Sequence, residues 1–160
     1  MVILGIDPGY GKIGYGVIEK LGNNYNTIDY GVIYTNKDLQ LSSRLLKIKE
    51  ELNNLIKHYK PDEAAVEELF FFKNVATAIQ VGEARGVILL TLEEENIPIY
   101  EYTPYQIKQA VTGYGHAEKG QIQRALKLIL KLEKNPTPDD AADALAAAFC
   151  HANFRRNSLK

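Results

Sequence analysis

The chain has 160 residues, 46% of them hydrophobic and 24% charged, which is the size and composition of a single globular domain over residues 1–160. Its one cysteine, Cys150, excludes an internal disulfide and fits a reducing cytoplasm, where we expect the protein to act. No apolar stretch approaches the ~18 residues of a membrane span. Asp7 and Pro8 interrupt the short apolar N-terminal run, so we expect neither a signal peptide nor a membrane partner.

The net charge of −1 hides an uneven distribution of charge along the sequence. Residues 104–134 include six basic and two acidic side chains, whereas residues 62–68 include four acids and no base. Such a chain can present a basic face that binds phosphates and an acidic pocket that binds metal ions. For any one of these lysines taken singly, an ordinary solvated surface is the favoured interpretation.

Three strands are predicted first, over residues 2–7, 13–19 and 25–35, separated by an Asp-Pro-Gly turn and an Asn-Asn turn. Apolar residues then recur at three- and four-residue steps from Leu41 to Tyr59. This spacing predicts a helix, and Lys60-Pro61 predicts its end.

Short strands and helices alternate in the rest of the chain. Strands are predicted over residues 64–67 and 97–101, and helices over 74–95, 117–132 and 138–153. A further helix is predicted between Thr103-Pro104 and Gly113, and Thr137-Pro138 predicts the cap and first residue of the last helix. The order βββαβαβααα predicts an α/β fold. We expect a mixed five-stranded sheet, with three antiparallel strands followed by βαβ crossovers, flanked by helices.

Four acidic residues from three separate segments stand where predicted elements begin or end. Asp7 closes an apolar strand, Glu67 follows Ala64-Ala65-Val66, and Asp140 and Asp143 lie at the start of an alanine-rich helix. A carboxylate is costly to bury without a partner. Carboxylates that converge from several elements repel each other unless cations lie between them. The pattern therefore predicts a site for hard divalent metal ions.

Each acid also has a purely structural explanation. Asp7 can form an Asx-turn with the backbone that follows it. Period-two alternation sends Glu67 and Glu68 to opposite faces, so only one of them can join Asp7. Asp139 and Asp140 complement the dipole of the helix that begins beside them, an effect of ~0.3–1 kcal/mol per charge. This last explanation fits Asp143 less well, because alanines surround it.

A glycine-rich loop, from Gly9 through Gly11 to Gly14, superficially matches a dinucleotide-binding fingerprint, with Asp29 placed 20 residues after Gly9. That fingerprint requires a helix N-terminus next. The following residues 15–18 are strand-like, so we reject it. Two interpretations remain: glycines that keep the space beside Asp7 clear for a substrate, and a plain tight hairpin.

Three consecutive aromatic residues, Phe70-Phe71-Phe72, follow the predicted strand that carries Glu67. At least one of them is predicted to be exposed beside the carboxylates, where an aromatic ring can stack on a base. Burial of all three in the core is the alternative. The histidines show no zinc-binding spacing. Cys150-His151 is predicted to lie in the last helix, in packing contacts and at its surface.

Taken together, these motifs resemble the RuvC-type Holliday junction resolvases. The likeness covers essentially the whole chain, in the family's order, and its specificity lies in that joint order and spacing. The matching segments are Gly5-Ile6-Asp7-Pro8-Gly9, residues 14–18, Val66-Glu67, Phe70, Lys73-Asn74, Ala84-Arg85-Gly86, Tyr102, residues 106–109, Ala117-Glu118-Lys119 and residues 140–146.

The resemblance implies an RNase H-like fold and a homodimer that cuts two opposing strands of a four-way DNA junction, leaving 5′-phosphates. It also implies a branch-migration helicase complex as a partner in recombination and DNA repair. Two Mg²⁺ ions per site are implied, with Mn²⁺ as a possible substitute. The implied site residues are the metal-binding catalytic carboxylates Asp7, Glu67, Asp140 and Asp143, the basic residues Lys108 and Lys119 near the scissile phosphate, and the DNA contacts Phe70 and Lys73.

The chain departs from the family pattern at two places. One extra residue before the last motif produces Asp139-Asp140, where the three-residue spacing to Asp143 favours Asp140 as the ligand. A long basic C-terminal tail is absent.

Three other functions are compatible with parts of this pattern. An ATP-binding protein of the actin-like superfamily needs two such domains, for which 160 residues are too few. A non-catalytic junction-binding module should lack one or more of the four acids. A related nuclease that acts on RNA would be distinguished by its preference for an RNA duplex over junction DNA.

Overall fold

The computed structural model describes residues 1–69 and 75–157. Phe70 and Lys73, two of the predicted DNA contacts, lie outside the described residues, as do Phe71, Phe72 and Asn74.

A mixed sheet of five strands forms the centre of the molecule, in the spatial order β3-β2-β1-β4-β5. Strands β1, β2 and β3 pair antiparallel, whereas β4 pairs parallel with β1, and β5 pairs parallel with β4. The predicted sheet is therefore confirmed. Its strands are β1 (Val2–Asp7), β2 (Lys12–Leu21), β3 (Asn24–Tyr34), β4 (Glu63–Glu67) and β5 (Ile99–Tyr102).

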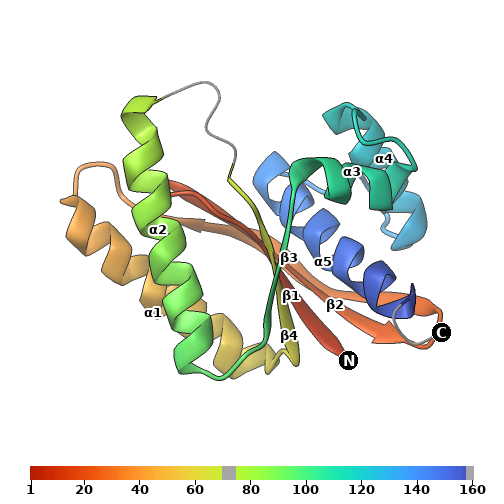
Figure 1. Ribbon diagram of the computed structural model, residues 1–160, viewed down its shortest axis with the longest axis horizontal. Helices are drawn as coiled ribbons and strands as arrows, with labels where there is room; N and C mark the ends of the chain where they lie inside the picture. Colours follow the sequence, from red (N-terminus) through yellow and green to blue (C-terminus); the bar gives the residue numbers. More distant parts are fainter. Residues whose placement is uncertain (70–74, 158–160) are drawn as a thin grey trace.

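Helices cover both faces of this sheet (Figure 1). One face carries α1 and α2, and the other carries α5 with α3 and α4 packed beyond it. No helix within residues 1–69 and 75–157 is long and apolar enough to cross a membrane. The helices are α1 (Leu41–Tyr59), α2 (Val75–Glu94), α3 (Pro104–Thr112), α4 (Lys119–Ile129) and α5 (Asp139–Asn157).

Local capping signals explain where two of the helices begin. Thr103 caps α3 in a capping box with Gln106, and Gly113 ends that helix in the left-handed conformation, as predicted. The prediction for α5 was one residue early. The carbonyl oxygen of Pro138 accepts from the amides of Ala141 and Ala142, so Pro138, rather than Thr137, occupies the capping position.

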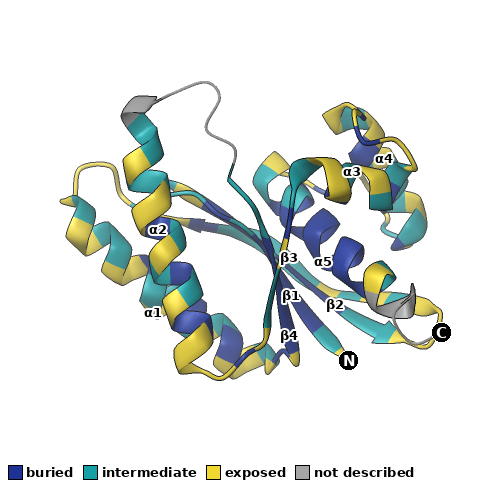
Figure 2. Cartoon of the chain, in the orientation of Figure 1, coloured by how far each residue is buried: buried dark blue, intermediate teal, exposed yellow. Residues whose placement is uncertain are grey.

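Strand residues alternate between two cores, and small residues face α5. Leu4 and Ile6 of β1 belong to the core under α1 and α2. Gly5 lies between them, where a Cβ atom would come within 2.0 Å of the carbonyl oxygen of Ala144. At Gly16 of β2 a Cβ atom would lie 2.8 Å from the Cα of Leu145. Helix α5 therefore lies unusually close to the sheet and is buried along most of its length (Figure 2).

Candidate active site

Asp7 and Glu67 end two adjacent parallel strands at the same edge of the sheet. Ile6 of β1 is in register with Val66 of β4, so the next residue of each strand is an acid. Their side chains face α5, because Ile3 of β1 and Ala65 of β4 lie on that face in the core formed with this helix. The two carboxyl groups are hydrogen-bonded to each other. Glu67, not Glu68, is therefore the residue that joins Asp7.

The first turns of α5 bring two more acids to this edge. Gly14 of β2 is paired with Asp7, and a Cβ atom at Gly14 would lie 1.9 Å from the carbonyl oxygen of Asp140 and 3.2 Å from the Cβ of Asp7. Both Asp140 and Asp143 act electrostatically on Asp7. The structure thus brings together the four acids that were predicted from three separate segments.

Crowding of these acids changes their protonation. Burial raises the pKa of Asp7 well above its ordinary value, and the neighbouring charges of Glu67, Asp143 and Asp140 raise it further. Burial raises the pKa of Glu67 to about 7 and Asp143 adds to the rise, opposed by the hydrogen bond with Asp7. The pKa of Asp143 is also raised, mainly by burial. The cluster therefore favours at least one bound proton at neutral pH in the absence of cations.

Lys108 of α3 and Lys119, the first residue of α4, supply positive charge beside the acids. Both lower the pKa of Glu67 and of Asp143. Their action on these two carboxyl groups places both lysines near the acids.

Asp139 contacts α4, and its charge also raises the pKa of Asp143. Its carboxylate accepts from the Nζ of Lys119 at 3.1 Å and from the Nε2 of Gln123 at 3.0 Å. It is absent from the charges that act on Asp7, whereas its neighbour Asp140 is among them. The geometry therefore favours Asp140 over Asp139 as a metal ligand.

The site has the right donor atoms for hard divalent cations, because all four acids offer carboxylate oxygens and remain partly exposed. Among residues 1–69 and 75–157, however, no three acidic, histidine or cysteine side chains are close enough to coordinate one ion as they stand. Binding of an ion would therefore have to draw the carboxylates together and release their shared proton.

The glycines of the hairpin after Asp7 make room for protein backbone. A Cβ atom at Gly9 would lie 2.1 Å from the carbonyl oxygen of Lys12 in the turn, and the space beside Gly14 is filled by Asp140. The interpretation that these glycines keep space clear for a substrate is therefore wrong at these two positions. The tight-hairpin interpretation is confirmed, and Gly14 additionally admits α5.

Arg44 of α1 holds the same hairpin from the other face and was not predicted. Its Nε donates to the Oγ1 of Thr35 at 2.9 Å, and its Nη2 donates to the carbonyl oxygen of Tyr10 at 3.1 Å. The guanidinium carbon also lies 4.6 Å from the centre of the Tyr10 ring. A single arginine on a partly exposed helix carries no sequence signal for such a contact.

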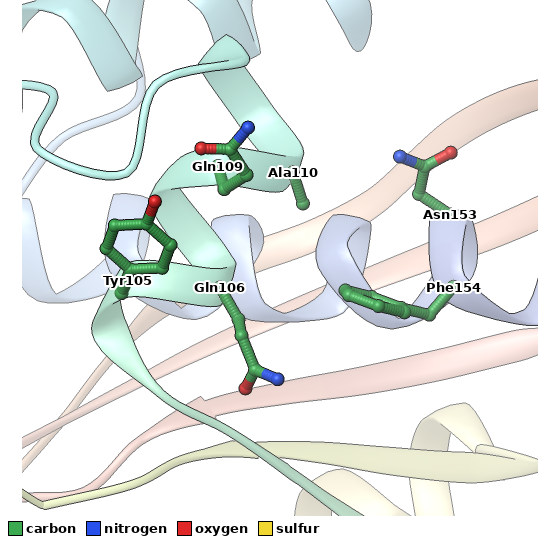
Figure 3. A pocket seen from close by; sticks show the side chains of 6 residues that line it. All are labelled: Tyr105, Gln106, Gln109, Ala110, Asn153 and Phe154. Atoms are coloured by element: carbon green, nitrogen blue, oxygen red, sulfur yellow. The ribbon is translucent and has the colours of Figure 1, made fainter.

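A separate pocket of about 260 Å³ lies between α3 and the C-terminal half of α5 (Figure 3). None of the four acids lines it, so it is distinct from the candidate active site. Its lining residues are Tyr105, Gln106, Gln109, Ala110, Asn153 and Phe154.

Comparison with known proteins gives these residues a family context. Residues 3–151 match the family described as crossover junction endodeoxyribonuclease RuvC. The chain belongs to the RuvC family. The RuvC of Petrotoga mobilis is 80% identical over 157 residues, covering 98% of this chain and 96% of the relative. The RuvC of Thermosipho melanesiensis is 58% identical over 152 residues, covering 95% of this chain and 97% of the relative.

A solved RuvC structure has the same fold. The RuvC of Thermus thermophilus, in complex with a Holliday junction substrate, superimposes with a TM-score of 0.92 at 35% identity, covering 99% of this chain and 96% of that one. The expected RNase H-like fold is thereby confirmed, and membership of the RuvC family removes the ATP-binding alternative.

Proposed function

We propose that this RuvC family chain resolves four-way DNA junctions by hydrolysing one phosphodiester bond in each of two opposing strands, with Asp7, Glu67, Asp140 and Asp143 as its catalytic carboxylates. The observation that carries the proposal is the convergence of these four acids from β1, β4 and α5 on one edge of the sheet. The Thermus thermophilus relative, solved with a Holliday junction substrate, supports the same substrate class here.

Two Mg²⁺ ions held by the four acids, or Mn²⁺ in their place, would activate the attacking water and stabilise the leaving 3′ oxygen, so that the products carry 5′-phosphates. Asp7 and Glu67 would lose their shared proton as the ions enter, because only the ionised carboxylates are good ligands. Lys119 and Lys108 would face the charge that develops on the phosphate. Asp139 holds the ammonium group of Lys119 beside the acids before DNA arrives.

Strand-specific nicking in Mg²⁺ tests this function. A labelled four-way junction should receive paired, symmetric cuts, whereas a linear DNA duplex and an RNA duplex of the same sequence should remain largely intact. Junction binding without cuts would instead identify a binding module. Preferential cutting of the RNA duplex would identify a nuclease with a different substrate.

We further propose that the single domain over residues 1–160 acts as a homodimer through the exposed face of α2. Ile79 and Leu90 are 70% and 56% exposed, and Cβ atoms added at Gly82 and Gly86 would meet nothing within 4 Å. Steps of three and four residues place these four positions on one side of the helix. A two-fold axis through this face would present one active site to each of two opposing strands.

Charges on this α2 face should separate the two subunits. The double variant Ile79→Asp, Leu90→Asp is expected to sediment as a monomer and to make unpaired nicks, because buried unpaired carboxylates oppose association. Leu128→Asp on α4, where the native leucine is 78% exposed, is the matched control and should leave the dimer intact. A dimer that survives the double variant would place the interface elsewhere.

The remaining proposed contacts rest on the family resemblance. Phe70 would probe unstacked bases at the junction, and Lys73 would contact the DNA backbone beside it. A branch-migration helicase complex would deliver the junction to the dimer.

The stability of the metal-free protein should fall as pH rises from about 4.5 to about 7. Glu67 has its pKa raised from 4.5 to about 7 on folding, so the folded state binds more protons than the unfolded state over this interval. Its favourable contribution is complete below pH 4.5 and is lost as the pH rises through about 7. Asp7, whose pKa is raised in the same direction, adds to the loss.

Thermal unfolding at pH 5 and pH 8 measures this dependence. Mg²⁺ should restore stability at pH 8 and have little effect at pH 5, because the cations replace the bound proton. Glu67→Gln should flatten the dependence on pH. An unchanged midpoint at pH 8 with and without Mg²⁺ would contradict cation binding by these acids.

A further inference from the structure

A buried chain of hydrogen bonds ties α5 to the sheet far from the active-site acids. The Nε2 of His151 lies 2.6 Å from the Oε2 of Glu63, and its Nδ1 lies 2.7 Å from the hydroxyl of Tyr102. The three residues are only 1%, 7% and 9% exposed, and the ring of Tyr100 stacks on His151 at 4.3 Å. His151 was predicted to serve packing and surface, and the surface part of that prediction is wrong.

Filling a core with these polar groups costs free energy that apolar side chains would not cost. A buried carboxylate and imidazole lose their hydration, and apolar residues of similar volume are often as stabilising as a buried ion pair. Such groups instead fix the relative position of the elements that they join, because a hydrogen bond specifies where its partner must lie.

The spacing along β4 matches the spacing along α5. Glu63 and Glu67 lie on the same face of β4, four residues or about 13 Å apart. His151 and Asp143 lie eight residues apart on α5, which is about 12 Å along a helix. His151 contacts Glu63 at one end, and Asp143 acts on Glu67 at the other. Helix α5 therefore runs antiparallel to β4. Segments of nearly equal length on the helix and the strand lie side by side, with a polar contact at each end.

Between those two contacts, α5 meets β1 through small residues. Gly5 faces the backbone of Ala144 and Ala148, so small side chains meet a glycine where larger ones would interlock. Tyr102 of β5 bridges the distance between these two polar contacts. Its backbone is in register with Glu67, while its hydroxyl reaches His151. The tyrosine thus connects the strand level of Glu67 to the distant half of α5.

We propose that Glu63, His151 and Tyr102 are positioning residues that set the register of α5 along β4 and thereby hold Asp143 beside Glu67. This inference rests on the proposed function only in giving those two acids a catalytic role. The register itself is a property of the metal-free protein. Loss of the hydrogen bonds should let α5 shift, which moves Asp143 away from Glu67 and weakens cation binding there.

The test compares Tyr102→Phe and Glu63→Gln with a control of similar thermal stability loss. Tyr102→Phe removes one hydroxyl and keeps the ring, and Glu63→Gln keeps the volume. Ile48→Val is the control, because Ile48 is buried in the core on the opposite face, under α1 and α2. For each variant the thermal midpoint, Mn²⁺ affinity by electron paramagnetic resonance of the free ion, junction affinity in EDTA and single-turnover cleavage are measured.

Both variants should weaken Mn²⁺ binding and slow single-turnover cleavage by about tenfold, with junction affinity in EDTA unchanged. Ile48→Val should lower the thermal midpoint without changing either quantity. The inference is overturned if Tyr102→Phe and Glu63→Gln lose stability like the control yet keep Mn²⁺ affinity and cleavage within about twofold of the parent. If the parent chain binds Mn²⁺ but cuts no junction, the proposed function fails, while the Mn²⁺ comparison still supports or refutes the positioning role.

Discussion

Asp7→Asn is expected to abolish junction cleavage, with a loss of at least about a thousandfold, while junction binding in EDTA remains. Asp7 is hydrogen-bonded to Glu67 and acted on by Asp140 and Asp143, so it is the acid that the other three share. An amide at this position keeps the volume but cannot supply the negative charge that two cations would need. Single-turnover cleavage of a labelled junction in Mg²⁺ measures the loss.

The same substitution should make the metal-free protein more stable at neutral pH. Burial and three neighbouring acids raise the pKa of Asp7, which means that its charge opposes folding. The neutral amide removes that opposition, so the thermal midpoint should rise as activity disappears. Asp38→Asn, at an exposed turn, is the matched control and should change neither quantity.

A pair of further variants resolves which aspartate at the start of α5 belongs to the site. Asp140→Asn should lose cleavage nearly as fully as Asp7→Asn, whereas Asp139→Asn should retain most of it. Asp139 forms an exposed ion pair with Lys119 and accepts from Gln123, and exposed ion pairs contribute ~0–1 kcal/mol. Normal cleavage by Asp7→Asn, or by Asp140→Asn, would contradict the proposed set of catalytic carboxylates.

Gly14→Ala is expected to destabilise the fold by about 1–3 kcal/mol and to reduce cleavage by about a hundredfold. The added methyl group would lie 1.9 Å from the carbonyl oxygen of Asp140, and this backbone atom cannot rotate away. Helix α5 must move, and it carries Asp140 and Asp143 with it. Urea unfolding and single-turnover cleavage measure the two effects.

Gly120→Ala on α4 is the control for Gly14→Ala. Its added methyl group would meet only the end of the flexible Arg124 side chain, at 3.3 Å. Alanine is a better helix former than glycine, so this variant should be as stable as the parent or slightly more so. If Gly14→Ala cleaved junctions at the parent rate, close packing of α5 on β2 would not be needed to place the acids.

The element order and the four acids were predictable because their signals are local. Alternation in residues 2–7, helical spacing from Leu41 to Tyr59 and the Thr103-Pro104 start each involve neighbours in the sequence. The acids stood out because charges at the ends of apolar segments need an explanation. Their likeness in order and spacing to RuvC proteins then implied the fold and activity that the comparisons support.

The first residues of α5 show where a local signal is ambiguous. Sequence spacing placed the cap at Thr137, but Pro138 holds that position and turns Asp139 toward Lys119. Two adjacent aspartates are nearly equivalent as a sequence pattern. Which one faces Asp7 depends on the rotation of the helix on the sheet, and that rotation is set by packing against β1 and β2.

By itself, therefore, the sequence determined the strands, the helices and the acids at their ends, and its resemblance to RuvC proteins indicated the basic residues near them. Tertiary structure alone decided that Gly14 makes room for Asp140, that Arg44 holds the hairpin after Asp7, and that His151 is buried between Glu63 and Tyr102. The physical reason is the difference in how far apart in the sequence the interacting residues lie. Strand and helix patterns come from interactions over a few residues, whereas these contacts join residues from 34 to 126 positions apart, whose proximity follows only from how α1 and α5 pack on the two faces of the sheet.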